Sequence, residues 1–390
     1  MDRADFPIWR TAFSGLLAML AALGVARFGF APLIPALTTA HWVSAPAAFD
    51  LGTLNLFGYL IGAAMARHRR LVIPVRAGII GLMALTTLSM LACAINLGFW
   101  WFAPWRLISG ITGGLLMVLM GQAVVARAPA AKRGVVGGLT FAGMGSGLTL
   151  SGFLIPFLLR AGLPAAWLAL GGICGLATLI VILILPPERM PPAPPVPASM
   201  RARPGRAVLW LSIAYGLCAI GFVPYILFWS NFIALGLGRG VAAGSAYAAL
   251  MGVAAALGPP LAGRMADRFG FGPTLAACYL LMALSVALPL GFTGPAALAV
   301  SSVGAGAIAM ATVILTSGRV AELVPPSAVA ASWGAATLAY SITQAAAAAG
   351  FSFLFRETGS YAPLFGIAAL ALLGASFLTF RTAREALAVA

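Results

Sequence analysis

Two arginines, Arg27 and Arg106, lie well inside long apolar stretches of this 390-residue chain. A charge placed among apolar groups is costly, so a basic side chain at such a depth points first to a functional site. The planar guanidinium donates two parallel hydrogen bonds to a carboxylate or phosphate group. The pair therefore predicts an anion site. The structural alternative is that each arginine extends to the end of its apolar segment or pairs with a backbone carbonyl.

Other reactive groups are sparse. The two histidines, His41 and His68, lie in predicted loops at opposite ends of the apolar segments, and the four cysteines show no metal-ligand spacing. No aspartate or glutamate lies deep in an apolar stretch, so the sequence holds no carboxylate relay for protons. We therefore expect no enzyme, no metal site and no other cofactor.

The elements that carry the arginines are predicted membrane-spanning helices. Hydrophobic residues make up 62% of the chain and charged residues 8%, too few polar groups for the surface of a soluble domain. A helix of about 20 apolar residues crosses the hydrocarbon layer of a bilayer. We predict twelve such helices in an all-α integral membrane protein, centred near residues 24, 58, 84, 113, 146, 175, 221, 252, 282, 308, 342 and 371.

The net charge of +15 has a topological explanation. Most basic residues fall in the N-terminal segment, the even-numbered loops and the C-terminal segment, which is the distribution expected of the cytoplasmic side. We therefore expect both termini in the cytoplasm of an inner-membrane protein, and no nucleic-acid binding. The basic residues on the expected cytoplasmic side include Arg67, Arg69, Arg70, Arg76, Arg127, Lys132, Arg133, Arg189, Arg201, Arg203, Arg206, Arg264, Arg268, Arg381 and Arg384.

A proline- and arginine-rich segment divides the chain. Residues 186–206 read as an extended cytoplasmic linker between a six-helix half at 1–185 and another at 207–390. The halves share a short repeat, because Gly29 to Ile34 in the first helix returns as Gly221 to Ile226 in the seventh, prolines in register. Parallel repeats of six helices are typical of transporters, although chance similarity in apolar sequence is an alternative.

Three further motifs contain spaced glycines. Residues Gly263 to Gly270 are similar to the G-x-x-x-D-R-x-G motif of the major facilitator superfamily, although Gly272 and Pro273 stand where basic residues usually follow. Residues Arg106 to Gly113 are similar to its R-x-x-x-G-x-x-G motif. The glycine-rich run Gly143 to Gly152 resembles its fifth-helix motif without the usual Gly-Pro pair. Residues Gly24 to Phe28, followed by Pro32 to Pro35, resemble the YbfB-like branch.

This resemblance implies a fold of two six-helix bundles in which helices one, four, seven and ten line a central cavity. It also implies a conformational latch at Gly263, Asp267, Arg268 and Gly270, with Asp267 acting on the fifth helix near Gly134; the alternative is a solvated loop carboxylate. By the rise of an α-helix, Arg27 and Arg106 reach similar depths in the outer half. The further substrate-binding candidates, many of them aromatic or hydroxylic and suited to an organic body, are Tyr215, Tyr225, Trp229, Asn231, Thr312, Thr316, Tyr340 and Gln344.

These observations predict a monomeric carrier in a lipid bilayer. Its substrate is a small organic solute, and the arginines favour an organic anion, moved by alternating access. Proton cotransport, uniport and exchange stay open, as do two other functions: efflux of drug-like or metabolite compounds, and a receptor that does not transport.

Overall fold

The computed structural model describes residues 8–67, 75–120, 133–185, 205–325 and 328–387. Across these ranges every regular element is a helix. Twelve helical segments are long and apolar enough to cross a membrane, and each predicted centre falls inside one of them. The predicted all-α architecture with twelve spans is therefore confirmed. Most of the predicted linker 186–206 lies outside the described residues.

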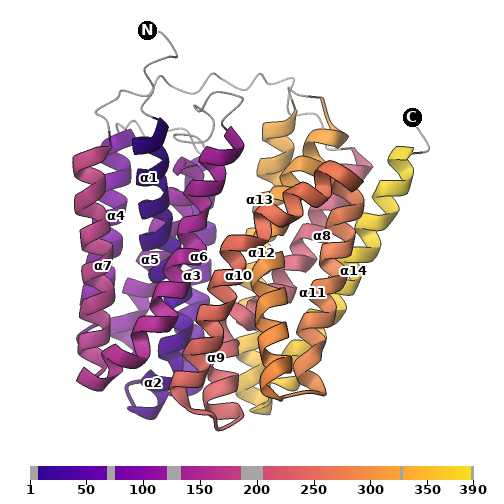
Figure 1. Ribbon diagram of the computed structural model, residues 1–390. Coiled ribbons are helices and arrows are strands. Elements are labelled where there is room, and N and C mark those ends of the chain that lie inside the picture. Colours follow the sequence, from indigo (N-terminus) through magenta and orange to yellow (C-terminus); the bar gives the residue numbers. More distant parts are fainter. Residues whose placement is uncertain (1–7, 68–74, 121–132, 186–204, 326–327, 388–390) are drawn as a thin grey trace. The chain divides into compact units, whose positions relative to one another are not determined.

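The chain forms two compact units. The described residues of 1–191 and of 229–252 make up the first unit, and those of 192–228 and 253–390 make up the second. The short segment 229–252 thus groups with the N-terminal spans, although it follows the linker in sequence. The division into six-helix halves at 1–185 and 207–390 stays a prediction. Figure 1 shows both units in the colours of the sequence.

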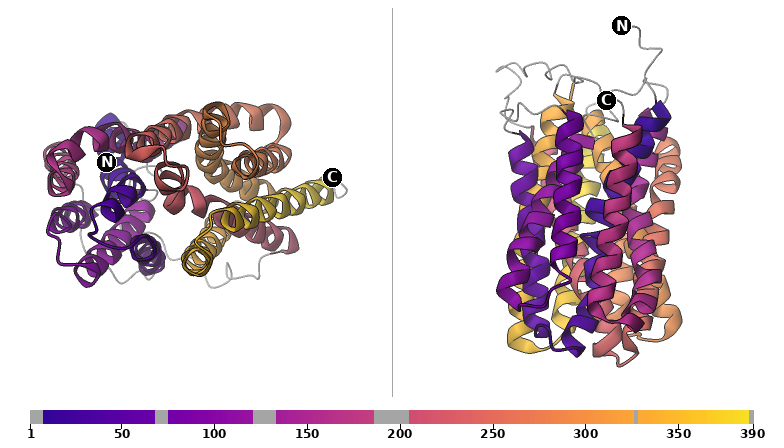
Figure 2. Two further views of the ribbon diagram at one scale, coloured as in Figure 1. Left: turned by 90° about the horizontal axis from the view of Figure 1, so that it is seen from below. Right: turned by 90° about the vertical axis from the view of Figure 1, so that its left-hand side faces the viewer.

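The first unit is a bundle whose helices run side by side along one direction (Figure 2). Its most extensive helix contacts are those of α3 with α5, α1 with α6, and α4 with α7. Span one, Trp9–Thr39, is the most deeply buried of the twelve spans. Its elements are α1 (Ile8–Met19), η2 (Leu20–Val25), η3 (Phe28–Leu33), α2 (Ile34–Thr39), α3 (Ala45–Arg67), α4 (Val75–Ala92), α5 (Phe99–Met120), α6 (Arg133–Leu158), η6 (Leu159–Ala161), α7 (Leu163–Ile184), α9 (Trp229–Asn231), η9 (Phe232–Gly236) and the first part of α10 (Gly240–Phe269).

The second unit is also a bundle of long helices. Helix α8 packs against α13, α14 and α12, and α11 packs against α14 and α12. Span seven, which begins with α8, is the second most buried span of the chain. The elements of this unit are α8 (Arg206–Val223), η8 (Pro224–Phe228), the rest of α10, α11 (Phe271–Ala287), η10 (Leu288–Leu290), α12 (Pro295–Leu323), α13 (Val329–Thr358) and α14 (Ala362–Leu387).

Glycines explain why α3 and α5 pack so closely. A Cβ atom added at Gly110 of α5 would lie 2.0 Å from the carbonyl oxygen of Asn55, and one at Gly58 of α3 would lie 2.2 Å from that of Leu107. Helices in lipid gain no hydrophobic driving force from contact with each other, so close backbone packing of this kind is a main source of their association. Gly110 of the R-x-x-x-G-x-x-G motif therefore has a structural role.

Candidate functional site

Span one is not a continuous α-helix. After α1 the chain forms a π-helix at Leu20–Val25, continues through Ala26 and Arg27, and then forms a 3-10 helix at Phe28–Leu33 that contains Pro32. π-Helical and 3-10 segments change the hydrogen-bond register, and proline has no amide hydrogen, so backbone groups in such a stretch need other partners. Irregular backbone at membrane depth is typical of transporter substrate sites. We call residues 20–33 the span-one break.

Arg106 of α5 supplies one of these partners. The amide of Phe30 bonds the carbonyl of Arg27 rather than that of Ala26, which a regular α-helix would use. The Ala26 carbonyl instead accepts a hydrogen bond of 2.8 Å from Nη1 of Arg106. The Arg106 guanidinium also lies 4.0 Å above the ring of Phe30, and the residue is 1% exposed. Arg106 therefore pairs with a backbone carbonyl, as the structural alternative to an anion site predicted.

A second donor reaches the span-one break from α7. The thiol of Cys174 lies 3.7 Å from the carbonyl oxygen of Ala21, which already accepts the π-helical bond from the amide of Ala26. Thiols are weak donors, so this contact adds little energy beside the Arg106 bond. It shows that side chains of two neighbouring helices, α5 and α7, contact the backbone of the break.

Arg27 lies within the break, between the π-helix and the 3-10 helix. Its guanidinium carbon lies 4.3 Å from the ring centre of Tyr59 in α3 and 5.4 Å from that of Phe28. The residue is 7% exposed. A cation over an aromatic face is stabilised by the quadrupole of the ring, more strongly when water is excluded. Tyr59 therefore helps to stabilise this buried charge, although no sequence motif marked it as a candidate.

Asn55 is another buried polar residue beside the site that was not among the predicted candidates. Its Nδ2 donates to the carbonyl oxygen of Arg106 at 3.1 Å and lies 3.4 Å from Oγ of Ser109, and it is 1% exposed. Asn55 precedes Tyr59 by four residues, so both lie on the face of α3 that meets α5. A lone asparagine in an otherwise apolar span is a signal for such an interhelical hydrogen bond.

Span seven repeats the irregularity of span one. Pro224 begins a π-helix at Pro224–Phe228, and a second π-helix follows at Phe232–Gly236. Both copies of the sequence repeat thus lie where a span departs from α-helical geometry. Between the two π-helices, Trp229 and Asn231 are fully buried in α9, which contacts η3 and α2 of the first unit. These two candidates therefore group with the span-one break.

Three predicted residues come together in the second unit. The ring centres of Tyr215 and Tyr340 lie 4.5 Å apart, and Nε2 of Gln344 lies 3.3 Å from the Tyr340 hydroxyl. The ring centre of Trp333, which was not a predicted candidate, lies 5.8 Å from that of Tyr215. We call Tyr215, Trp333, Tyr340 and Gln344 the aromatic cluster. Its rings and amide suit an apolar or aromatic group that also carries polar atoms.

The other three candidates of the second unit hydrogen-bond to neighbouring helices. The Tyr225 hydroxyl bonds Oγ of Ser301 at 2.5 Å and lies 3.3 Å from the carbonyl oxygen of Ser285. Buried hydroxyls shared in this way contribute to helix association within the unit. The two threonines behave similarly: Thr312 contacts the Cys218 thiol at 3.8 Å, and Thr316 lies 3.5 Å from the Tyr279 hydroxyl.

The predicted latch motif ends α10. Gly263 has no atom within 4 Å of an added Cβ, and Asp267 and Arg268 are exposed in the last turn. Gly270 follows with φ of +86°, a conformation that glycine adopts without steric cost, and it turns the chain into α11. The predicted partner region near Gly134 belongs to the other unit. The latch therefore stays a prediction.

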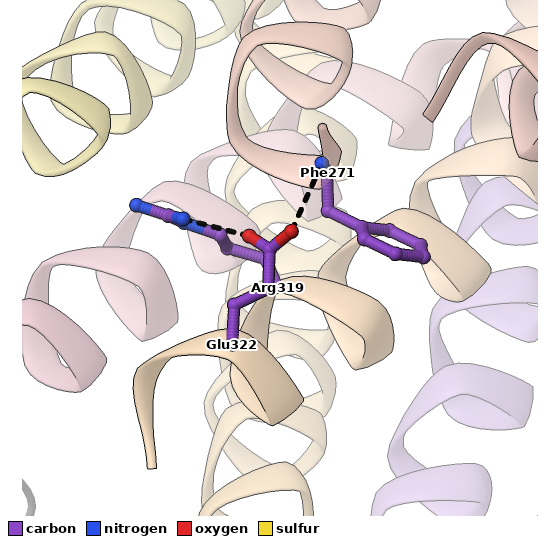
Figure 3. A network of polar contacts seen from close by, with 3 residues as sticks. All are labelled: Phe271, Arg319 and Glu322. Carbon is purple, nitrogen blue, oxygen red and sulfur yellow. Dashed lines mark hydrogen bonds and ion pairs between the residues drawn. The ribbon is translucent and has the colours of Figure 1, made fainter. Parts of the chain in front are cut away.

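Glu322 of α12 bonds to Phe271, the residue after Gly270, and to Arg319. Nη1 of Arg319 lies 2.7 Å from Oε2 of Glu322, and Oε1 of Glu322 accepts from the amide of Phe271 at 3.3 Å (Figure 3). The carboxylate thus caps the N-terminus of α11, where a negative charge is favourable. Arg319 is 6% exposed. Arg319 was not singled out from the sequence, and its i, i+3 spacing to Glu322 was the signal that could have found it.

No group of three or more His, Cys, Asp or Glu side chains that could hold a metal ion occurs in the part of the chain that the structure describes. The four cysteines are free thiols and buried.

A family model described as "Uncharacterised MFS-type transporter YbfB" matches residues 19–379. No curated protein matches the chain. Among solved structures, a D-xylose-proton symporter is 18% identical with a TM-score of 0.75, and the match covers 95% of this chain and 96% of that one. The peptide transporter POT, as a mutant in complex with alafosfalin, is 12% identical with a TM-score of 0.76, covering 97% and 94%. These likenesses show the fold, and the family match over most of the chain shows that it belongs to the YbfB family of major facilitator transporters, which are multi-pass membrane proteins.

Proposed function

We propose that this transporter moves a small organic anion across the membrane by alternating access, and that Arg27 supplies the charge that recognises it. Transport follows from the family, whereas the anion rests on one observation: the Arg27 guanidinium is buried in the break of the most buried span. A cation kept at that depth favours an anionic ligand. The inner membrane, cytoplasmic termini and a monomeric state are parts of the same proposal.

The surroundings of Arg27 support this role. Tyr59 stabilises the positive charge through its ring and contributes no formal negative charge of its own. A cation over an aromatic face keeps its formal charge, and a guanidinium forms stronger, charge-assisted hydrogen bonds with a carboxylate or phosphate. Its planar fork then binds carboxylate or phosphate oxygens in pairs.

The aromatic cluster of the second unit supports an organic body on the substrate. Tyr215, Trp333 and Tyr340 bring three rings together, and Gln344 adds an amide next to them. Such a cluster of rings also suits drug-like compounds, so efflux of an aromatic metabolite or drug is the second candidate function. The two candidates differ in the charge they require of the substrate.

A matched set of compounds tests the anion proposal. Benzoate, benzylammonium and benzyl alcohol share a ring and differ in charge, and butyrate, butylammonium and butanol form the aliphatic counterpart. Binding to the native state raises the melting temperature of the purified protein. We expect the anions to raise it most, and radiolabelled benzoate to enter proteoliposomes that contain the protein. Equal or larger stabilisation by the ammonium compounds would contradict the proposal, and binding without flux would favour a receptor.

Two variants show whether the effect depends on Arg27. Arg27→Gln removes the charge, and we expect it to lose about 1.5 to 3 kcal/mol of anion-binding free energy, the value of a charge-assisted hydrogen bond. Arg27→Lys keeps the charge without the fork and is expected to be intermediate. Arg160→Gln, which removes an exposed charge of the same unit, serves as the control.

A further inference from the structure

We infer that Arg106 is a positioning residue: its guanidinium holds the span-one break in the conformation that presents Arg27, and it does not itself bind the transported anion. Anion recognition by Arg27 rests on the proposed function, whereas the bracing of the break by Arg106 does not. The two buried arginines then have different tasks, although both were predicted to contact the substrate.

The contacts of Arg106 lie on both sides of Arg27 in the chain. Its Nη1 donates to the carbonyl of Ala26, the residue before Arg27, at 2.8 Å. Its guanidinium carbon lies 4.0 Å from the ring centre of Phe30, three residues after Arg27. A single side chain from α5 therefore contacts both flanks of the segment that carries Arg27.

The break needs such a brace because the 3-10 hydrogen bond next to Arg27 is weak. The 3-10 bond from the amide of Phe30 to the carbonyl of Arg27 is 3.4 Å long. Bonds of this type have poorer geometry than α-helical ones. The Ala26 carbonyl is not used by that bond, and a buried carbonyl without a partner costs free energy. The charge-assisted bond from Arg106 meets this need.

Arg106 is itself held in place. Asn55 donates to its backbone carbonyl at 3.1 Å, and one turn later Gly110 packs directly on the backbone of Asn55. The guanidinium thus extends from a helix whose position against α3 is fixed by close backbone contact. The same helix α3 presents Tyr59 to Arg27. The pairing of α3 with α5 therefore controls both the brace and the ring that faces Arg27.

A positioning role and an anion-binding role predict different effects of replacing Arg106 by lysine. The bond to Ala26 uses one Nη1 donor, and a lysine ammonium can also supply one donor to a carbonyl. Arg106→Lys should therefore keep most of the function of Arg106, whereas Arg106→Gln should not. If Arg106 instead bound the anion through its planar fork, lysine would lose that paired contact.

Hydrogen–deuterium exchange of the full-length protein in nanodiscs tests the brace without any ligand. We expect Arg106→Gln to speed exchange in peptides covering residues 20–33 by about tenfold, the equivalent of about 1.4 kcal/mol. Arg106→Lys should restore slow exchange, and Arg160→Gln should leave it unchanged. Phe30→Leu, which removes the ring under the guanidinium, should also speed it. Unchanged exchange in the break in both Arg106→Gln and Phe30→Leu would overturn the inference, and Phe30→Leu keeps the test decisive if Arg106→Gln does not fold.

Benzoate and benzylammonium binding test the second half of the inference. We expect Arg106→Gln to weaken benzoate binding about tenfold while the preference for benzoate over benzylammonium persists, because Arg27 keeps its charge. Arg106→Lys should bind benzoate nearly as well as the natural protein does. Arg106→Lys could instead show slow exchange in the break but bind benzoate as weakly as Arg106→Gln. That result would show that Arg106 contacts the anion, and would overturn the inference. Should the natural protein bind neither benzoate nor butyrate, the proposed function fails while the exchange result still decides the brace.

Discussion

The guanidinium carbon of Arg27 lies 4.3 Å from the ring centre of Tyr59. This contact connects the irregular part of span one to α3. The side chain of Tyr59 contacts the charge, and its backbone carbonyl packs against Gly114 of α5, where an added Cβ would lie 2.3 Å away. The position of the ring therefore depends on the packing of α3 against α5. A change in that packing is expected to move the ring away from the charge.

Replacement of Tyr59 separates its ring from its hydroxyl group. Tyr59→Phe keeps an aromatic face over Arg27 and is expected to bind benzoate nearly as the natural protein does. Tyr59→Leu removes the face, and we expect it to lower the free energy of unfolding by about 2 kcal/mol, the value of a desolvated cation–π contact. Melting curves of the two variants check this. Equal destabilisation by both would show that the hydroxyl, and not the ring, stabilises Arg27.

Gly110 is expected to be intolerant of a side chain. An added Cβ would meet the carbonyl oxygen of Asn55 at 2.0 Å, which requires one helix backbone to shift, so Gly110→Ala should destabilise the protein by about 1 to 3 kcal/mol. Gly138 in α6 faces open space, and Gly138→Ala should be neutral or stabilising by up to about 1 kcal/mol. Thermal unfolding of both variants gives the comparison. Tolerance of alanine at Gly110 would show that α3 and α5 pack less closely than these distances indicate.

Although its side chain is partly exposed, Glu322 should matter more to stability than Glu357 does. It caps α11 through the Phe271 amide and pairs with the buried Arg319 at 2.7 Å, so Glu322→Gln is expected to destabilise the protein by about 1 to 2 kcal/mol. Glu357→Gln, at an exposed position near the end of α13, is the matched control and should have little effect. Similar melting temperatures of the two variants would argue against the cap.

The charge distribution predicts the orientation of the chain. Reporter enzymes fused after Arg203 or at the C-terminus should be active in the cytoplasm, and those inserted at Gly162 or Gly238 should be active outside it. Gly162 and Gly238 lie in turns between helices with positive φ, at 97° and 66°, where an insertion is tolerated more readily than inside a helix. A cytoplasmic reporter signal at Gly162 would contradict the predicted orientation.

The motif at the end of α10 predicts a conformational role for Asp267. If its charge favours the outward-facing state, Asp267→Asn should shift the population toward the inward-facing one, since only contacts that differ between two states move their equilibrium. Labelling rates of single-cysteine reporters on the two sides of the membrane measure this shift, and Glu357→Gln is again the control. Unchanged labelling on both sides would leave Asp267 as a solvated carboxylate.

The sequence alone determined the twelve spans, because a bilayer imposes one length and one polarity on every helix that crosses it. The sequence also shows the repeat around Pro32 and Pro224, but the irregular geometry of spans one and seven at these prolines appeared only in the structure. Arg27 and Arg106 were conspicuous in the sequence because charged residues are rare in apolar spans.

Only the tertiary structure decided what these side chains contact. Arg106 and Ala26 are 80 positions apart, and no local pattern indicates that one donates to the other. The partners Asn55, Tyr59 and Trp333 were overlooked because an amide or a ring in an apolar span is compatible with lipid contact, with packing and with binding. The choice among these depends on how the helices rotate about their axes and how closely their glycines let them approach, and both are properties of the packed bundle.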